Sequence, residues 1–161
     1  MKYLIIAIIT LAFLGFKCND EKVNETTCPD LVSLLIHQYP TNDAIKYDVD
    51  SNSIKVWLHR KNVGADSILE QKTIGNEHFK NYCSLINRFD TTRYSNNCVQ
   101  DGQVMTLLFS KKDSTYKKIN FSNYYHVDLG VIINFINSKV DSTYTIHYDK
   151  DKLIKELKNC K

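Results

Sequence analysis

Two histidine–aspartate pairs come closest to a catalytic or metal-binding pattern. His126 precedes Asp128 by two positions, and His147 precedes Asp149 by the same interval. On a β-strand this spacing places both side chains on one face, as a general-base couple or a pair of metal ligands requires. Each pair, however, lies where one expected element ends and another begins, and an aspartate there often caps a helix. We therefore interpret both pairs as structural, with a small hydrolase using His126 or His147 as the alternative function.

Longer catalytic signatures are absent from the sequence. The chain has no G-x-S-x-G elbow for a serine nucleophile, no glycine-rich phosphate loop and no H-E-x-x-H zinc motif. No two cysteines have C-x-x-C spacing, which argues against a zinc knuckle or a thioredoxin-like redox site. We predict no catalytic residue, no metal and no cofactor, and we favour a role other than that of an enzyme.

Trp57 is the residue that we single out for binding. It alternates with Val56 and Leu58, so it lies on the opposite face of an expected strand, together with Lys55 and His59. An exposed tryptophan among charged residues is typical of a protein-binding surface. If helices cover this face instead, Trp57 belongs to the core, since tryptophan is highly buried on average.

The first 17 residues are predicted to be a secretory signal. Lys2 gives it a positive start, and an unbroken apolar run follows from residue 3 to residue 16. A membrane-spanning helix needs about 20 apolar residues, and this run is shorter. Its length and charged start are typical of the hydrophobic region of a signal peptide. We expect the chain to be exported.

The apolar run is followed almost at once by Cys18, and then by the charged stretch 19–22. This segment resembles the signal of small surface lipoproteins of Bacteroidota-type bacteria, in which the cysteine is lipidated and becomes the mature N-terminus. Residues 15–17, Gly-Phe-Lys, depart from the lipobox of that family, which has leucine followed by small residues. The resemblance implies a lipid on Cys18, a polar tether over 18–26, and anchoring to the outer membrane of the cell envelope.

The cysteine count agrees with a lipid on Cys18. Five cysteines leave one thiol unexplained in an exported protein, and a lipid on Cys18 removes it. The other four can form two disulfides in three ways. We predict Cys83–Cys98, which would join a helix to the next strand, and Cys28–Cys160, which would join the two ends of the domain.

Residues 27–161 are expected to form a single α+β domain. Alternating apolar residues predict strands over 45–49, 54–58, 67–74, 103–110, 116–121 and 144–148. Helical spacing predicts four helices. The first starts at Pro29 and ends before Tyr39-Pro40, and the second runs from Asn76 to Phe89. The third follows an Asp128 cap and reaches Ile136, and the last carries Leu153 to Leu157.

A weak internal repeat decides the expected architecture. A shift of 47 residues aligns Asp66-Ser67 with Asp113-Ser114, Asn76 with Asn123 and Ile86-Asn87 with Ile133-Asn134. The expected order strand–strand–helix repeats in step. We predict one antiparallel sheet built from two strand–strand–helix repeats, with helices on one face and further helices at the N- and C-terminal ends.

Charge excludes one class of partner. Removal of Lys2 and Lys17 with the signal lowers the formal net charge from +3 to +1, too little for a nucleic-acid-binding protein.

By analogy with inhibitor and immunity-type proteins, we expect a lipid-anchored, non-catalytic module that binds another macromolecule, an unidentified protein. A structural accessory of an outer-membrane complex is a further alternative.

Overall fold

The computed structural model describes residues 28–160, apart from 42, 61–65, 76–79 and 100–101. The predicted signal 1–17, the lipidation site Cys18 and the tether 18–26 lie outside the described residues. No helix in the described ranges is long and apolar enough to cross a membrane.

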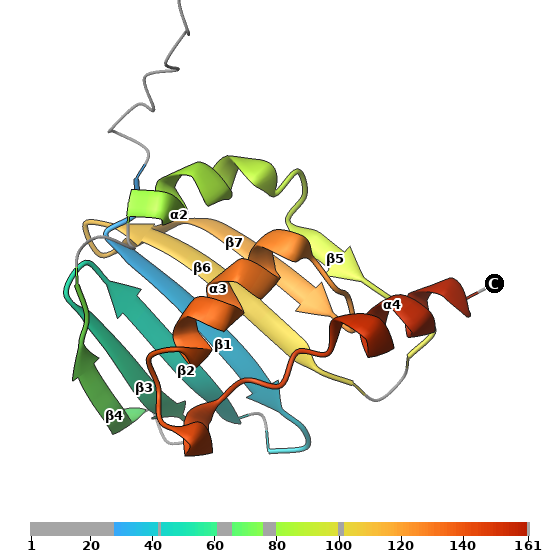
Figure 1. Cartoon of the computed structure of the whole chain (residues 1–161), viewed down its shortest axis with the longest axis horizontal. Helices are drawn as coiled ribbons and strands as arrows, with labels where there is room; N and C mark the ends of the chain where they lie inside the picture. The colour runs from blue at the N-terminus through green and yellow to red at the C-terminus, as the bar shows by residue number, and fades with distance from the viewer. Residues whose placement is uncertain (1–27, 42, 61–65, 76–79, 100–101, 161) are drawn as a thin grey trace, which may run out of the picture.

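The centre of the fold is a seven-stranded mixed sheet with the order β4-β3-β2-β1-β6-β7-β5 (Figure 1). Its strands are β1 Leu31–Gln38, β2 Asp43–Asp50, β3 Ser53–His59, β4 Asp66–Thr73, β5 Arg93–Ser95, β6 Val104–Lys111 and β7 Ser114–Ser122. Strands β1 to β4 form an antiparallel meander, and β6 and β7 form an antiparallel hairpin beside β1. The short β5 pairs in parallel with β7.

The predicted N-terminal helix is wrong, because residues 31–38 form the central strand β1. The leucines at 31, 34 and 35 imitate helical spacing, but Val32, Leu34 and Ile36 also alternate. Leu31 and Leu35 are half-buried on the opposite face of the strand, so apolar residues occur on both faces and the simple alternation that identifies a strand is lost. β1 pairs with β2 over eight residue pairs and with β6 over seven.

Both predicted hairpins are confirmed, and each turn has a local cause. Between β2 and β3, Asp50 Oδ1 accepts hydrogen bonds of 2.7 Å from the backbone N–H groups of Asn52 and Ser53. Between β6 and β7, Lys112 and Asp113 have φ values of 49° and 62°. Two left-handed residues in succession match the twist of the flanking strands, as in a type I′ turn.

The helical segments are α2 Lys80–Leu85, the 3₁₀ turn η2 Ile86–Arg88, α3 Val127–Asn137, the 3₁₀ turn η3 Ser142–Tyr144 and α4 Lys150–Lys158. α3 runs across the middle of the sheet (Figure 1) and buries Leu129, Ile132, Ile133 and Ile136. The predicted strand 144–148 is wrong. The backbone N–H and C=O of Ile146 hydrogen-bond the side-chain amide of Asn137, at 2.7 and 2.9 Å, and not a neighbouring strand.

The predicted architecture is therefore wrong, although the coarse class α+β is compatible with the structure. The predicted sheet was entirely antiparallel and made of two adjoining strand–strand–helix repeats with helices on one face. In the structure the β3–β4 and β6–β7 hairpins are separated by β2 and β1, and β5 adds a parallel strand. The chain segment taken for an N-terminal helix supplies the strand that separates the two supposed repeats.

The four predicted disulfide cysteines do form two disulfides, but with another pairing. Cys28 pairs with Cys83 and Cys98 with Cys160, with Cα–Cα distances of 4.7 and 5.6 Å. The predicted pairs Cys83–Cys98 and Cys28–Cys160 are therefore wrong. The prediction paired Cys28 with Cys160 to join the two ends of the domain, whereas the start of β1 lies at the same end of the sheet as α2, which carries Cys83 (Figure 1).

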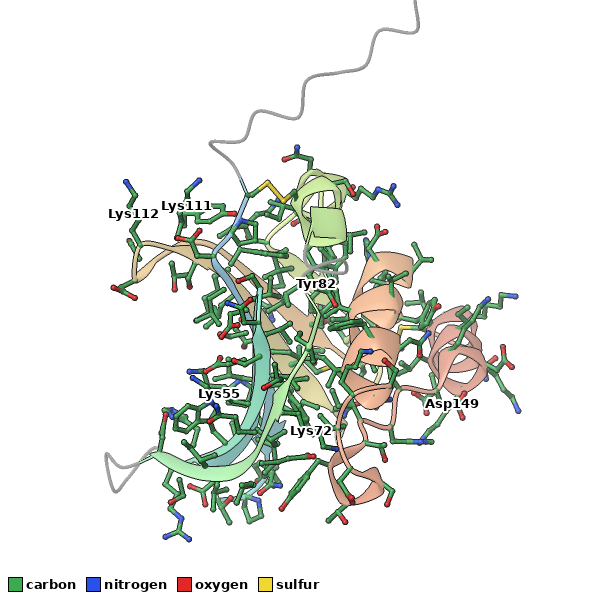
Figure 2. All side chains as sticks on the ribbon, turned by 60° about the vertical axis from the view of Figure 1, so that its left-hand side comes forward. Lys55, Lys72, Tyr82, Lys111, Lys112 and Asp149 are labelled. Atoms are coloured by element: carbon green, nitrogen blue, oxygen red, sulfur yellow. A yellow bond between two sulfur atoms is a disulfide. The ribbon has the colours of Figure 1, made fainter. Side chains whose placement is uncertain are left out.

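The two faces of the sheet have different surroundings. One face carries Val32, Leu34, Tyr47, Val56, Leu107 and Ile119, and these join the helical residues in the core. Figure 2 shows the sheet nearly edge-on, with Tyr82 and Asp149 on this side and Lys55 on the other. The start of β4 and the β6–β7 turn, with Lys111 and Lys112, both reach toward the side of Lys55 (Figure 2). We call the side of Lys55, Trp57 and Lys46 the uncovered face.

Candidate functional site

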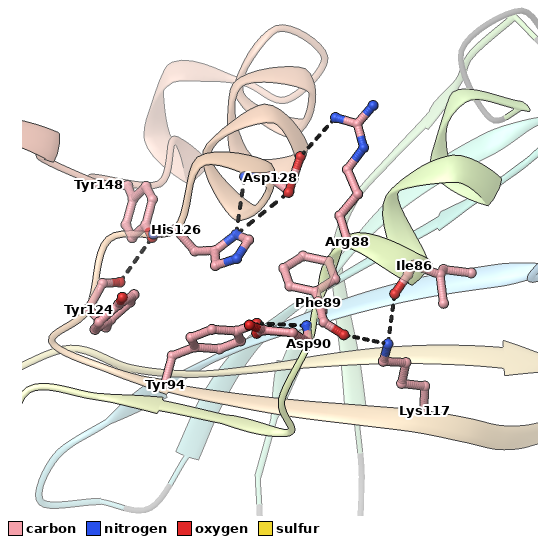
Figure 3. Close-up of polar contacts among 10 residues, drawn as sticks. All are labelled: Ile86, Arg88, Phe89, Asp90, Tyr94, Lys117, Tyr124, His126, Asp128 and Tyr148. Carbon is pink, nitrogen blue, oxygen red and sulfur yellow. Dashed lines mark hydrogen bonds and ion pairs between the residues drawn. The ribbon is translucent and has the colours of Figure 1, made fainter.

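His126 lies in an aromatic cluster under α3 (Figure 3). Its ring centroid is 4.8 Å from that of Phe89, 4.7 Å from that of Tyr94 and 6.2 Å from that of Phe121. Its Nδ1 accepts a hydrogen bond of 3.2 Å from the backbone N–H of Asp128 and so caps the helix. The predicted cap was Asp128, and this detail is wrong, since His126 occupies the cap position itself.

The His126–Asp128 pair does not form a general-base couple. The shortest distance from His126 Nδ1 to an Asp128 carboxylate oxygen is 3.9 Å, which is too long for a hydrogen bond. Asp128 Oδ1 instead accepts a hydrogen bond of 3.3 Å from Arg88 (Figure 3). The backbone N–H of His126 donates to Tyr148 Oη, which in turn donates to the carbonyl of Tyr124. This geometry positions the start of α3.

Nearby polar groups also act within the fold (Figure 3). The ammonium of Lys117 donates to the carbonyls of Ile86 and Phe89 at 2.7 and 3.0 Å, which ends η2, and burial lowers the pKa of this lysine. The hydroxyl of Tyr94 donates to Asp90, and this bond is the main cause of the lowered pKa of that carboxyl.

The second pair, His147 and Asp149, lines a cavity of about 360 Å³ at the end of β1. The side chain of Asp149 caps α4 by accepting a hydrogen bond of 2.9 Å from the backbone N–H of Lys152. Within the described ranges, no hydrogen bond or ion pair joins His147 to Asp149. His37 and Glu156 also line the cavity, which therefore brings together several polar groups.

Trp57 is half-buried on the uncovered face. Lys46 of the neighbouring strand lies opposite it, with its ammonium 5.9 Å from the centre of the indole ring. The same ammonium forms an ion pair of 2.9 Å with Asp48, which also accepts a hydrogen bond from Ser33. Trp57 is thus neither a core residue nor a free aromatic side chain, but one end of a polar row that crosses three strands.

A second polar row crosses β1, β6 and β7 on the same face. His37 Nε2 lies 3.1 Å from Thr106 Oγ1, and the Thr106 hydroxyl donates to Asn120 Oδ1 at 3.2 Å. Ser33, Asp48 and Thr106 are buried although they lie on the uncovered face. Their hydrogen bonds therefore hold the side chains of this face in fixed positions.

The sequence indicated Trp57 as a candidate binding residue but did not indicate the residues around it. Lys46 was detectable in principle, because it faces the same way as Trp57 across a predicted hairpin. His37 was assigned to a helix, and Arg93, at the start of a three-residue parallel strand, carries no local signal.

The described residues contain no group of three or more histidine, cysteine, aspartate or glutamate side chains that could hold a metal ion. Comparisons with protein-family models, with curated proteins and with solved structures find no match to the chain.

Proposed function

We propose that the chain is an exported, lipid-anchored and non-catalytic module that binds another protein through the uncovered face of its sheet. The observation that carries the proposal is the pair of hydrogen-bonded polar rows on that face, one of which ends at Trp57 and Lys46. Preorganised polar side chains beside an aromatic ring lose little conformational freedom when they bind.

The size of the face agrees with a protein partner. Six of the strands have seven to nine residues and lie about 4.8 Å apart, so they span roughly 24 by 26 Å, or about 620 Å², and the three-residue β5 extends one edge. A standard protein–protein interface buries about 800 Å² on each partner. Half-buried or exposed apolar side chains on this face, Leu35, Ile68, Val104 and Leu108, supply the apolar part of such an interface.

The disulfides support export, because such bonds persist in oxidising compartments. A lipid on Cys18 would tether the domain through residues 18–27, at most about 35 Å of extended chain. The domain would then face its partner close to the membrane surface.

Site-specific photocrosslinking tests the proposal. A photoreactive residue replaces Lys55 on the uncovered face or, as the control, the exposed Val131 of α3, in the full chain expressed in bacteria of the type that the signal resembles. We expect a discrete crosslink to another protein from position 55 and none from position 131. A crosslink from position 131 alone, or a product of two copies of this chain, would contradict the proposal. Copurification with an outer-membrane complex without a crosslink from position 55 would favour the structural accessory.

A further inference from the structure

A second cavity, of about 350 Å³, lies at the β5 end of the sheet. It is lined by Arg93, Tyr94, Val104, Asn120, Phe121 and Ser122. Four of these side chains belong to the uncovered face, and Tyr94 and Phe121 belong to the core. Asn120 lies opposite Thr106, Ser122 lies opposite Val104, and Arg93 of β5 lies beside Asn120. The cavity is therefore part of the face that we propose to bind a partner.

The polar row on β1, β6 and β7 orients the amide of Asn120. A hydroxyl has one hydrogen, and Thr106 gives it to Asn120 Oδ1, so the Thr106 oxygen accepts from His37 Nε2. Because the carbonyl oxygen of the Asn120 amide is engaged in this row, its NH₂ group supplies two donors at the cavity. Arg93 and Ser122 add a guanidinium and a hydroxyl.

The charges around the cavity favour an anion. Strands β1, β5, β6 and β7 contain no aspartate or glutamate, whereas β2 and β4 contain five. Of the described carboxylates, the one nearest in sequence to the cavity residues is that of Asp90, and it accepts a hydrogen bond from the Tyr94 hydroxyl. The cationic side chains Arg93 and Lys118 thus lie on a part of the uncovered face whose strands carry no opposing carboxylate.

We infer that this cavity binds a carboxylate side chain of the protein partner. A guanidinium presents paired N–H donors that match the two oxygens of a carboxylate. The amide of Asn120 and the hydroxyl of Ser122 add donors, and Val104 supplies an apolar wall for the methylene groups of an aspartate or glutamate. The inference rests on the proposed function and specifies the partner as one that presents an acidic segment.

The test uses a fluorescein-labelled, N-acetylated hexaglutamate peptide and measures its fluorescence anisotropy with the full-length chain. Arg93→Gln and Asn120→Asp should each weaken binding at least tenfold. Arg60→Gln removes the same charge at the exposed residue after β3 and should change the affinity less than twofold. Thermal melting by circular dichroism verifies that each variant is folded. An equal loss for Arg60→Gln and Arg93→Gln would show binding by diffuse charge and would overturn the inference.

Competition separates carboxylate from phosphate. At equal ionic strength, acetate should displace the peptide at least as well as inorganic phosphate does. Displacement by phosphate at tenfold lower concentration would identify a phosphate site and overturn the inference. Peptide binding that depends on Arg93, without a crosslink from position 55, would contradict the proposed function and leave the carboxylate site standing. If the Arg93→Gln chain still crosslinks from position 55 and binds the peptide with unchanged affinity, the carboxylate site is contradicted and the proposed function stands.

Discussion

At the scale of single residues, the surroundings of His126 and His147 decide what each can do. His126 is enclosed by Phe89 and Tyr94, and its Nδ1 is occupied by a backbone N–H. His147 is exposed beside a cavity, and its neighbour Asp149 is committed to capping α4. A histidine general base is commonly oriented by a carboxylate and must be reached by substrate, and in the described residues neither histidine is hydrogen-bonded to the aspartate two positions after it.

We expect His126→Ala to lower the free energy of unfolding by about 3 kcal/mol, because it removes both a helix cap and a partly buried ring. His126→Asn should lose about 1 kcal/mol less, since an asparagine oxygen can still accept the N–H of Asp128. Urea denaturation measures both values. Equal losses would argue against the capping role, and a loss of hydrolytic activity at unchanged stability would favour the alternative of a hydrolase.

Trp57→Ala should weaken binding of the crosslinked partner by about 2 kcal/mol or more, as expected for an aromatic hot spot. Because the ring is half-buried, we expect it to cost about 2 kcal/mol of stability, less than the 3–5 kcal/mol of a core aromatic. Trp57→Phe is the matched control, since it keeps an aromatic ring and removes an indole N–H that is buried without a partner in the described residues. Its stability should stay within about 1 kcal/mol of the wild type. An unaltered partner affinity in Trp57→Ala would remove Trp57 from the interface.

At the scale of elements, short local interactions hold the turns, while disulfides hold the weakly packed segments. The β2–β3 turn depends on Asp50, which accepts bonds from two backbone N–H groups and the Ser53 hydroxyl. α4 has no buried residue, and Cys160, directly after it, is bonded to Cys98 in the loop after β5. The helix is thus capped at its start by Asp149 and joined covalently, just after its end, to the loop after β5.

Stability should fall in acid partly through Asp50. Partial burial would raise the pKa of this carboxyl, but the hydrogen bonds from Ser53 and Asn52 and the charge of Lys55 lower it overall. A lowered folded-state pKa gives stability that is present above the unfolded-state value of about 3.9 and lost as the pH falls through the folded-state value. In thermal melts, the difference between wild type and Asp50→Asn should therefore shrink from pH 5 to pH 2. Ser53→Ala, which removes one donor, should weaken this dependence, and a constant difference would contradict it.

The double variant Cys98→Ser/Cys160→Ser should release α4. A disulfide that spans 62 residues stabilises by about 4 kcal/mol in the chain-entropy account. We expect denaturant unfolding to show a loss of this size and hydrogen exchange to show faster exchange in α4 than in β1. Non-reducing peptide mapping of the wild type should recover Cys28–Cys83 and Cys98–Cys160. A Cys83–Cys98 peptide would instead restore the pairing predicted from the sequence.

At the scale of the whole molecule, the sheet separates two surfaces with different tasks. One side holds the helices and the aromatic cluster around His126, and the other presents Trp57, Lys46 and the Arg93 cavity. Cys28, where the described chain begins, is joined to Cys83. The predicted tether would thus leave the domain at a fixed point, beside the end of the sheet that carries the β6–β7 turn (Figure 1).

The prediction at this scale is a lipid on Cys18. Mass spectrometry of the full-length protein, extracted from the envelope, should find residue 18 as a diacylglyceryl-cysteine N-terminus. Cys18→Ser should release the protein from the membrane fraction with both disulfides intact, because neither disulfide involves this residue. An unmodified Cys18 in a soluble mature chain would contradict the anchor.

The sequence by itself determined the features that depend on near neighbours. Apolar alternation and turn residues identified both hairpins and β4, helical spacing and a cap identified α4, and the cysteine count led to two disulfides. The hairpins, β4 and α4 follow from interactions within a few residues, which leave a readable period in the chain. The disulfides span 55 and 62 residues, and only their number follows from the cysteine count.

Only the tertiary structure decided the rest. β1 was missed because apolar residues on both of its faces obscure the alternation of a strand. The strand order, the cysteine pairing and the repeat architecture were predicted wrongly as a result. The Arg93 cavity joins β5, β6 and β7 through a three-residue parallel pairing that no local pattern marks. Such contacts depend on which distant segments pair along an edge of the sheet. The free energy that favours one pairing over another comes from contacts throughout the sheet.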